Sequence, residues 1–319
     1  MIRWLTFAVI ATGLAWSGIW LWQASAQRSA TESWIAGQQA RGWLVEVDDI
    51  TLRGFPNRLD QTFTGLTIGD PDANSLLETE VFQILRLSYA KDHIIAVWPT
   101  PLRITGPQGT LTAQSDQMRA SVISAPDGTL NRANLEAAVL NITTNAGTLA
   151  IAALNAALQQ TGETTYRITL NADGVVPGDL IRTSSSLPQT LQTLRADLHL
   201  TFIAPLDTQT PQRPLPTRID LALAEADWGP MRLKLAADLD VSDTGLLDGS
   251  VTVQADNWRD MLALARDSVP NGTLRLIDNG LTAIAGLSGN AQSLDITLTI
   301  RRGQMSLGLL PLGPAPRLR

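Results

Sequence analysis

Apolar and polar residues alternate along several stretches of this 319-residue chain. The segment MRLKLAADLDV at 231–241 places Met, Leu, Leu, Ala, Leu and Val at every second position, and charged residues fill most of the others. A period of two sends alternate side chains to opposite faces of a strand, so the pattern predicts a strand with one apolar face. LDITLTI at 294–300 repeats it, as do shorter runs at 166–170, 198–202, 219–223 and 251–253.

The fold class predicted from these runs is mainly β, with long amphipathic antiparallel sheets, since strands with one apolar face are typical of such sheets. Turn-forming triplets such as PDG and DTG separate the runs. A few packing helices are expected near 148–160, 257–268 and 274–286, where apolar residues recur at helical spacing, and Asn257 is the predicted N-cap of the second.

A segment with four prolines, 205–217, predicts a loop that divides the chain. It separates an N-terminal β-rich half, 44–204, from a C-terminal β-rich half with two helices, 218–319. The sheet can continue across this loop.

The N-terminus carries no charged residue from Trp4 to Ala26. About 20 apolar residues suffice to cross a bilayer, and tryptophans stand near both ends of the run, as in the aromatic belts of membrane proteins. The sequence therefore predicts a transmembrane anchor within 1–26, spanning the membrane at about 4–24. A helical stalk is expected at 27–43.

A cleaved signal peptide is the alternative, because Ala24-Ser25-Ala26 has the small residues that signal peptidase accepts. Either way the rest of the chain is exported. We expect a single-pass inner-membrane protein with its C-terminal bulk in the periplasm.

The sequence GFPNR at 54–58 predicts a rigid structural corner between two strands. Proline fixes its own φ and favours an extended residue before it, and asparagine tolerates turn conformations. Phe55 is expected to pack at the end of the sheet, and Arg58 to pair with Asp48 or Asp60. A loop that contacts a ligand is the alternative. The corner comprises Gly54, Phe55, Pro56, Asn57 and Arg58.

Several segments resemble a bacterial envelope family of unknown function, DUF2125. They are GWLVEVDDITLRGFPNRLD, DPDANSLLETEVFQILRLSYAKDHIIAVWP, SDQMRASV and the terminal LDITLTIRRGQMSLGLLPLGPAP. The resemblance implies a membrane-anchored, β-rich periplasmic protein and implies no activity. A weaker architectural resemblance is to AsmA-like envelope proteins, which are associated with lipid movement and outer-membrane upkeep.

The net charge of -6, without a basic stripe, argues against nucleic acid as a partner.

The sequence contains only weak matches to catalytic and metal-binding motifs. There are no cysteines and two histidines, His93 and His199, and no nucleophile elbow or phosphate loop is present. Asp70, Asp72 and Asn74 match the start of a calcium loop, but its required glycine and glutamate are absent. We expect no catalytic residues, no cofactor, no metal and no enzyme activity.

The apolar sheet face is the remaining functional candidate. It is either sealed as an ordinary core or partly open as a trough for acyl chains, whose burial contributes about 0.8 kcal/mol per methylene. The expected lipid-facing residues are Leu233, Leu235, Ile296 and Leu298, with the 54–58 corner shaping one end of the trough.

The expected partners are the inner membrane, phospholipid and proteins of the envelope. The favoured function is lipid binding in envelope maintenance. A scaffolding partner of envelope machinery is the first alternative. A periplasmic hydrolase that uses His93 or His199 with a carboxylate is the second.

Overall fold

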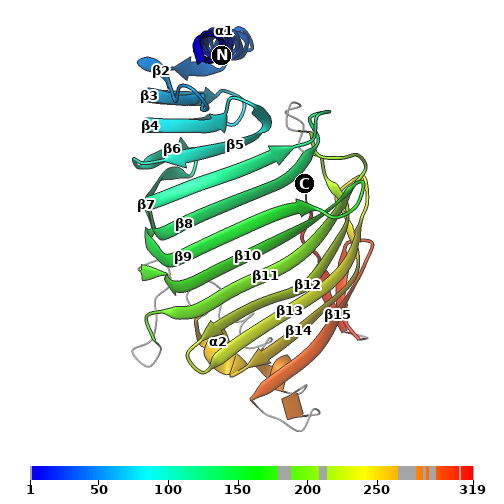
Figure 1. The fold of residues 1–319 in the computed structure, drawn as a ribbon. Helices are drawn as coiled ribbons and strands as arrows, with labels where there is room; N and C mark the ends of the chain where they lie inside the picture. The colour runs from blue at the N-terminus through cyan, green and yellow to red at the C-terminus, as the bar shows by residue number, and fades with distance from the viewer. Residues whose placement is uncertain are drawn as a thin grey trace. The chain divides into compact units, whose positions relative to one another are not determined.

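The computed structural model describes residues 2–178, 188–207, 214–264, 278–282, 285–286, 292–308 and 310–318. The chain divides into two compact units. The first contains Met1–Ile123 and Asn141–Asn145, and the second contains Ser124–Leu140 and Ala146–Arg319. The expected mainly β fold is confirmed, because antiparallel strands make up most of the described elements (Figure 1).

The first unit begins with one long helix and continues as antiparallel strands. Strands β1 and β2 both pair with β3, β3 pairs with β4, and β4 pairs with β5 and β6, which both pair with β7. The elements are α1 (Ile2–Ala40), β1 (Leu44–Glu46), β2 (Asp49–Arg53), β3 (Asp60–Asp70), β4 (Ser75–Leu87), β5 (Ala90–Trp98), β6 (Leu102–Gly106) and β7 (Gly109–Ser124).

Helix α1 joins the predicted anchor and stalk in one continuous helix of 39 residues, long and apolar enough to cross a membrane. It ends at Ala40, three residues before the predicted end of the stalk. Gly42 follows with a φ of 87°, and the amide of Trp43 donates back to the carbonyl of Gln38 at 3.1 Å. A glycine with positive φ just after the last turn is a common way to end a helix.

The second unit is mainly a meander in which strands from β9 to β17 pair with their neighbours in chain order. Its elements are β8 (Leu130–Thr144, of which 141–144 belong to the first unit), β9 (Gly147–Gln160), β10 (Thr165–Val176), β11 (Leu191–Phe202), β12 (Pro216–Trp228), β13 (Met231–Val241), β14 (Leu247–Asp256), α2 (Trp258–Leu264), β15 (Ser293–Arg301), β16 (Gln304–Leu307) and β17 (Leu310–Pro314).

The helix predicted at 148–160 is wrong, because this segment forms strand β9. Its partners on β10 run from Val176, opposite Ala150, to Tyr166, opposite Gln160. An alanine-rich segment favours a helix in isolation. Here Leu154, Ala156 and Leu158 also satisfy a period of two, and the ladder of hydrogen bonds with β10 decides between the two patterns.

The second predicted helix is present as α2, and residues 265–268 of the prediction lie outside the described residues. Residues 278–282 and 285–286 are helical, in agreement with the third prediction, whose remaining residues are not described. Asn257 directly precedes α2, as predicted for its N-cap, and its carbonyl accepts from the amide of Asp260 at 3.0 Å, but among the described contacts its side chain does not bind the first turn. Its amide nitrogen donates instead to the carbonyl of Pro230 at 2.5 Å, and its backbone has a φ of 56°.

The proline-rich segment 205–217 does not divide two compact units, since β11 and β12 on either side of it pair. Strand β12 begins at Pro216, so the last two residues of the predicted loop are strand. The amide of Leu206 donates to the hydroxyl of Tyr166 at 2.9 Å, and the carbonyl of Leu206 accepts from Leu130 at 2.7 Å. This part of the segment is therefore held inside the second unit.

Candidate functional site

Strand pairing in the second unit brings apolar residues from seven strands into two neighbouring rows. One row runs from β15 to β9 through Ile296, Val253, Leu235, Ala224, Ala196, Leu170 and Ala156. The other runs through Leu298, Val251, Ala237, Leu221, Leu198, Ile168 and Leu158. We call these residues the aliphatic rows. Neighbouring strands lie about 4.8 Å apart, so the rows cross roughly 29 Å of sheet.

Every side chain of the aliphatic rows is half-buried, and none is fully buried. A sheet face that is covered by a second layer buries its apolar side chains as a core. Among the described residues, this part of the face is therefore not sealed in that way.

Two buried clusters close the face at its ends on β13, β14 and β15. One contains Ala255, Trp258, Ala285 and Leu294, with helix α2 packed over it. The other contains Leu239, Val241, Leu247, Ile300 and Ala315. The chain after β17 is held at this second end, where the amide of Ala315 donates to the carbonyl of Gly303 at 2.8 Å.

The four predicted lipid-facing residues share this apolar face. Leu235 and Ile296 both pair with Val253 in one row, and Leu298 lies in the other. Leu233 pairs with Ala255 and packs against the cluster around Trp258. Leu233 therefore lies at the closed end, and the other three lie in its half-buried middle.

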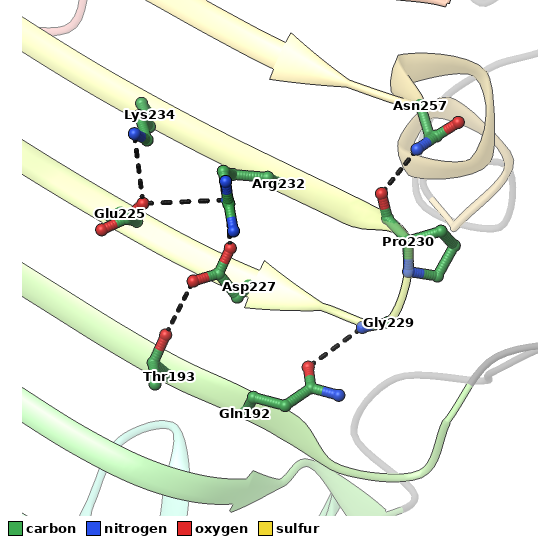
Figure 2. A network of polar contacts seen from close by, with 9 residues as sticks. All are labelled: Gln192, Thr193, Glu225, Asp227, Gly229, Pro230, Arg232, Lys234 and Asn257. Carbon is green, nitrogen blue, oxygen red and sulfur yellow. Dashed lines mark hydrogen bonds and ion pairs between the residues drawn. The ribbon is translucent and has the colours of Figure 1, made fainter.

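The opposite face of the same strands carries a network of charges (Figure 2). Arg232 on β13 contacts Asp227 on β12 at 2.6 Å, and Asp227 accepts a further hydrogen bond from Thr193 on β11 at 3.0 Å. Glu225 lies 3.4 Å from Lys234 and 3.9 Å from Arg232. The hydrogen bond from Arg232 lowers the pKa of Asp227, and Asp227 in turn raises the pKa of Arg232. The sheet thus separates a charged face from an aliphatic one.

The network continues at the strand ends, where the amide of Gly229 donates to Gln192 at 3.0 Å (Figure 2). Arg167 on β10 pairs with Asp197 on β11, and this hydrogen bond lowers the pKa of Asp197. Such exposed pairs contribute little to stability individually. Their main consequence is to fix which face of the sheet meets water.

The predicted corner is confirmed as the connection between β2 and β3, and Arg58 pairs with Asp60 at 2.9 Å as expected. Its contact partner was not predicted. The indole N–H groups of Trp16 and Trp20 on α1 donate to the carbonyls of Pro56, at 3.0 Å, and Arg58, at 2.7 Å.

Phe55 is 56% exposed and meets the ring of Trp20 edge-on, with ring centroids 5.6 Å apart. It therefore packs against α1, whereas the sequence predicted that it packs at the end of the sheet. The described contacts of the corner lie in the first unit, and the aliphatic rows lie in the second, so the expectation that the corner shapes one end of the trough stays a prediction.

Both histidines occupy ordinary strand positions. His93 on β5 shares a hydrogen bond of 2.9 Å with the hydroxyl of Ser121 on β7. His199 on β11 lies between Arg167 and Asp220 of the neighbouring strands, on the charged face. His93 thus lies beside a hydroxyl, and among the described contacts no third group that would orient its ring is found.

The suggested calcium segment is the turn between β3 and β4. A carboxylate oxygen of Asp70 accepts from the amides of Asp72 and Ala73, at 2.9 and 3.2 Å. No group of three or more metal-ligating side chains is found among the described residues. A cavity of about 460 Å³ in the first unit is lined by Glu46, Asp48, Glu78, Glu80 and Arg103, among others, and was not predicted.

The model of an uncharacterized protein family conserved in bacteria, DUF2125, matches residues 20–316. Searches of curated proteins and of solved structures find no match. The weaker resemblance to AsmA-like proteins is supported by neither search.

Proposed function

We propose that this chain, which belongs to the DUF2125 family, is a membrane-anchored protein whose aliphatic rows bind lipid acyl chains. The observation that carries the proposal is the partial exposure of every side chain in the two rows. Large exposed apolar patches on soluble domains mark surfaces that bind something apolar. An acyl chain fits a face of aliphatic side chains, and its burial contributes about 0.8 kcal/mol per methylene.

The anchor is α1, which keeps the chain beside a source of lipid. Contacts of Trp16, Trp20, Gln27 and Thr31 with the first unit support a helix that stays attached. Signal cleavage after Ala26 would remove the first two of these contacts. Arg3 ahead of the span favours the inner membrane with the bulk of the chain in the periplasm.

The rows contain no charged or hydrogen-bonding side chain, so they offer a ligand apolar contact alone. Affinity would come from apolar burial and would change little with salt or with the head group of the lipid. The process served is maintenance of the envelope. A scaffolding protein would instead use the same face for a protein partner.

A paired substitution on β15 tests the proposal. Leu298→Arg places a charge in one aliphatic row, and Thr297→Arg places it on the opposite, exposed face of the same strand. Native mass spectrometry of the full-length protein, released from detergent, is expected to show bound phospholipid in the wild type and in Thr297→Arg. Leu298→Arg is expected to carry less of it, with unchanged circular dichroism, because only lipid held beside α1 would remain.

Equal lipid content in all three proteins would contradict the proposal, since it would assign the lipid to the anchor alone. A stable complex with another protein in place of lipid would favour scaffolding.

A further inference from the structure

Helix α1 consists of two parts that differ in their contacts. Residues 2–16 are exposed along their whole length. From Ser17 onward a half-buried stripe follows one side of the helix, at Ser17, Trp20, Gln23, Ala24, Gln27, Thr31, Ile35 and Gln38. The spacing of three and four residues shows that this one side packs against the strands of the first unit. The first contact along the helix is the hydrogen bond from Trp16 to the corner.

The part of α1 ahead of this contact is too short to cross a bilayer. Residues 4–15 are twelve charge-free residues, which extend about 18 Å at 1.5 Å per residue. The hydrocarbon core of a bilayer is about 30 Å thick. The remaining distance of roughly 12 Å takes about eight more residues, and residues 16–23 are also free of charge. A tilted helix would need still more residues.

We propose that the corner of the first unit is immersed in the outer half of the membrane, where it binds lipid beside α1. This inference rests on the anchoring role of α1 proposed above and is independent of lipid binding by the aliphatic rows. Trp16 and Trp20 lie within the eight residues that complete the span, and both bind the corner. The corner therefore lies at the same depth in the membrane as these two side chains.

Four carbonyls of the corner accept hydrogen bonds, which favours an apolar environment, in which each unpaired backbone group costs several kcal/mol. The carbonyls of Gly54 and Asn57 accept from the amides of Arg58 and Ser88, at 2.7 and 2.8 Å. The carbonyls of Pro56 and Arg58 accept from the two indoles of α1. Pro56 itself has no amide N–H to satisfy.

A second exposed apolar loop lies beside the corner. Arg58 forms a bridge with Leu87 at the end of β4, and the amide of Ser88 binds the carbonyl of Asn57. Leu87 is 37% exposed and the adjacent Tyr89 is 68% exposed. Together with Phe55 they form an apolar tip next to the helix, and tyrosine is a residue that membrane interfaces favour.

An ion pair lies at the tip. Arg58 pairs with Asp60, so the two side chains neutralise each other. The side chain of Arg58 is about half exposed, and arginines near an interface extend their guanidinium groups toward the lipid phosphates.

Single cysteines carrying a nitrobenzoxadiazole label test the inference, because the chain has no cysteine of its own. Phe55→Cys and Tyr89→Cys place the label at the tip. Leu14→Cys places it on the exposed part of α1. Asp72→Cys places it in the turn beyond the far end of β3, whose 11 residues span about 36 Å at 3.3 Å each. The full-length protein is reconstituted in vesicles of phosphatidylethanolamine and phosphatidylglycerol.

A nitroxide on the lipid acyl chains is expected to quench the labels at 14, 55 and 89 several-fold more than the label at 72. Iodide in the water is expected to show the reverse order. Phe55→Cys removes the contact between Phe55 and Trp20, and the label at position 89 reports on the tip with that contact intact.

The four labels separate the possible failures. Labels at 55 and 89 that iodide quenches, with the label at 14 in lipid, would overturn the immersed corner and leave the anchor standing. A label at 14 that iodide quenches would overturn the anchor and this inference together. A label at 72 in lipid would show the first unit lying along the membrane, which also contradicts immersion of the corner alone.

Discussion

Ile300→Asp is expected to unfold the C-terminal strands of the second unit. Ile300 is 3% exposed and packs with Leu239, Val241, Leu247 and Ala315 at the closed end of the apolar face. The substitution removes buried methyl groups and places a carboxylate without a partner in an apolar cluster. A loss of more than about 4 kcal/mol is expected, which is a large part of the stability of an ordinary domain.

The measurement is denaturant unfolding followed by circular dichroism, with Thr297→Asp as the control on the exposed face of the same strand. The control is expected to change stability by no more than about 0.5 kcal/mol. Leu235→Asp, in the half-buried middle, is expected to fall between the two. A loss at position 235 as large as at position 300 would indicate that the middle of the face is sealed.

Tyr166→Ala is expected to have the second largest effect, a loss of about 3–5 kcal/mol. Tyr166 is 0% exposed on β10, and its ring meets that of Phe202 edge-on at 5.9 Å. Its hydroxyl also accepts the amide of Leu206, which holds the chain after β11 against the sheet. The substitution leaves a cavity and frees this segment.

Tyr166→Phe separates the two contributions in the same unfolding experiment. It keeps the ring and removes the acceptor, so a loss of about 1 kcal/mol is expected. If Phe cost as much as Ala, the hydrogen bond to Leu206 and not the packing of the ring would hold this end of the second unit together.

Strands β13 and β15 could be predicted from the sequence because polar and apolar residues alternate along them, with Ala236 of β13 as the exception. β9 could not, because alanine is compatible with both periods and the pairing with β10 decides its structure. In β12 the alternation of Ile219, Leu221 and Leu223 predicts that their side chains share one face of the sheet. A bulge after Leu221 shifts the register. Leu223 then lies opposite Asp197 and is 36% exposed.

The corner at 54–58 was predictable as a turn, whereas its contact with α1 was not. Trp16 and Pro56 are 40 positions apart, and neither carries a local signal for the other. The side of α1 that packs on the strands includes Ser17, Gln23, Gln27, Thr31 and Gln38. This side is no more apolar than the rest of the helix, because the other sides of its first half also carry apolar residues. Hydrophobic periodicity therefore could not reveal it.

The division of the sheet into a charged and an aliphatic face was predictable, and the partial exposure of the aliphatic rows among the described residues was not. Alternation shows which side chains share a face. Whether a second layer covers that face depends on contacts between distant segments. The half-buried state of Leu235, Ile296 and Leu298 is visible only in the structure.

Photo-crosslinking at single positions tests lipid binding by the aliphatic rows most directly. The photoreactive residue p-benzoylphenylalanine is placed in the full-length chain in bacterial cells, at Leu235 and Ile296 in the rows and at Lys234 and Thr297 on the opposite face. The proposal predicts phospholipid adducts at positions 235 and 296 and none at 234 and 297. Protein adducts in place of lipid at 235 and 296, or equal lipid labelling at all four positions, would contradict it.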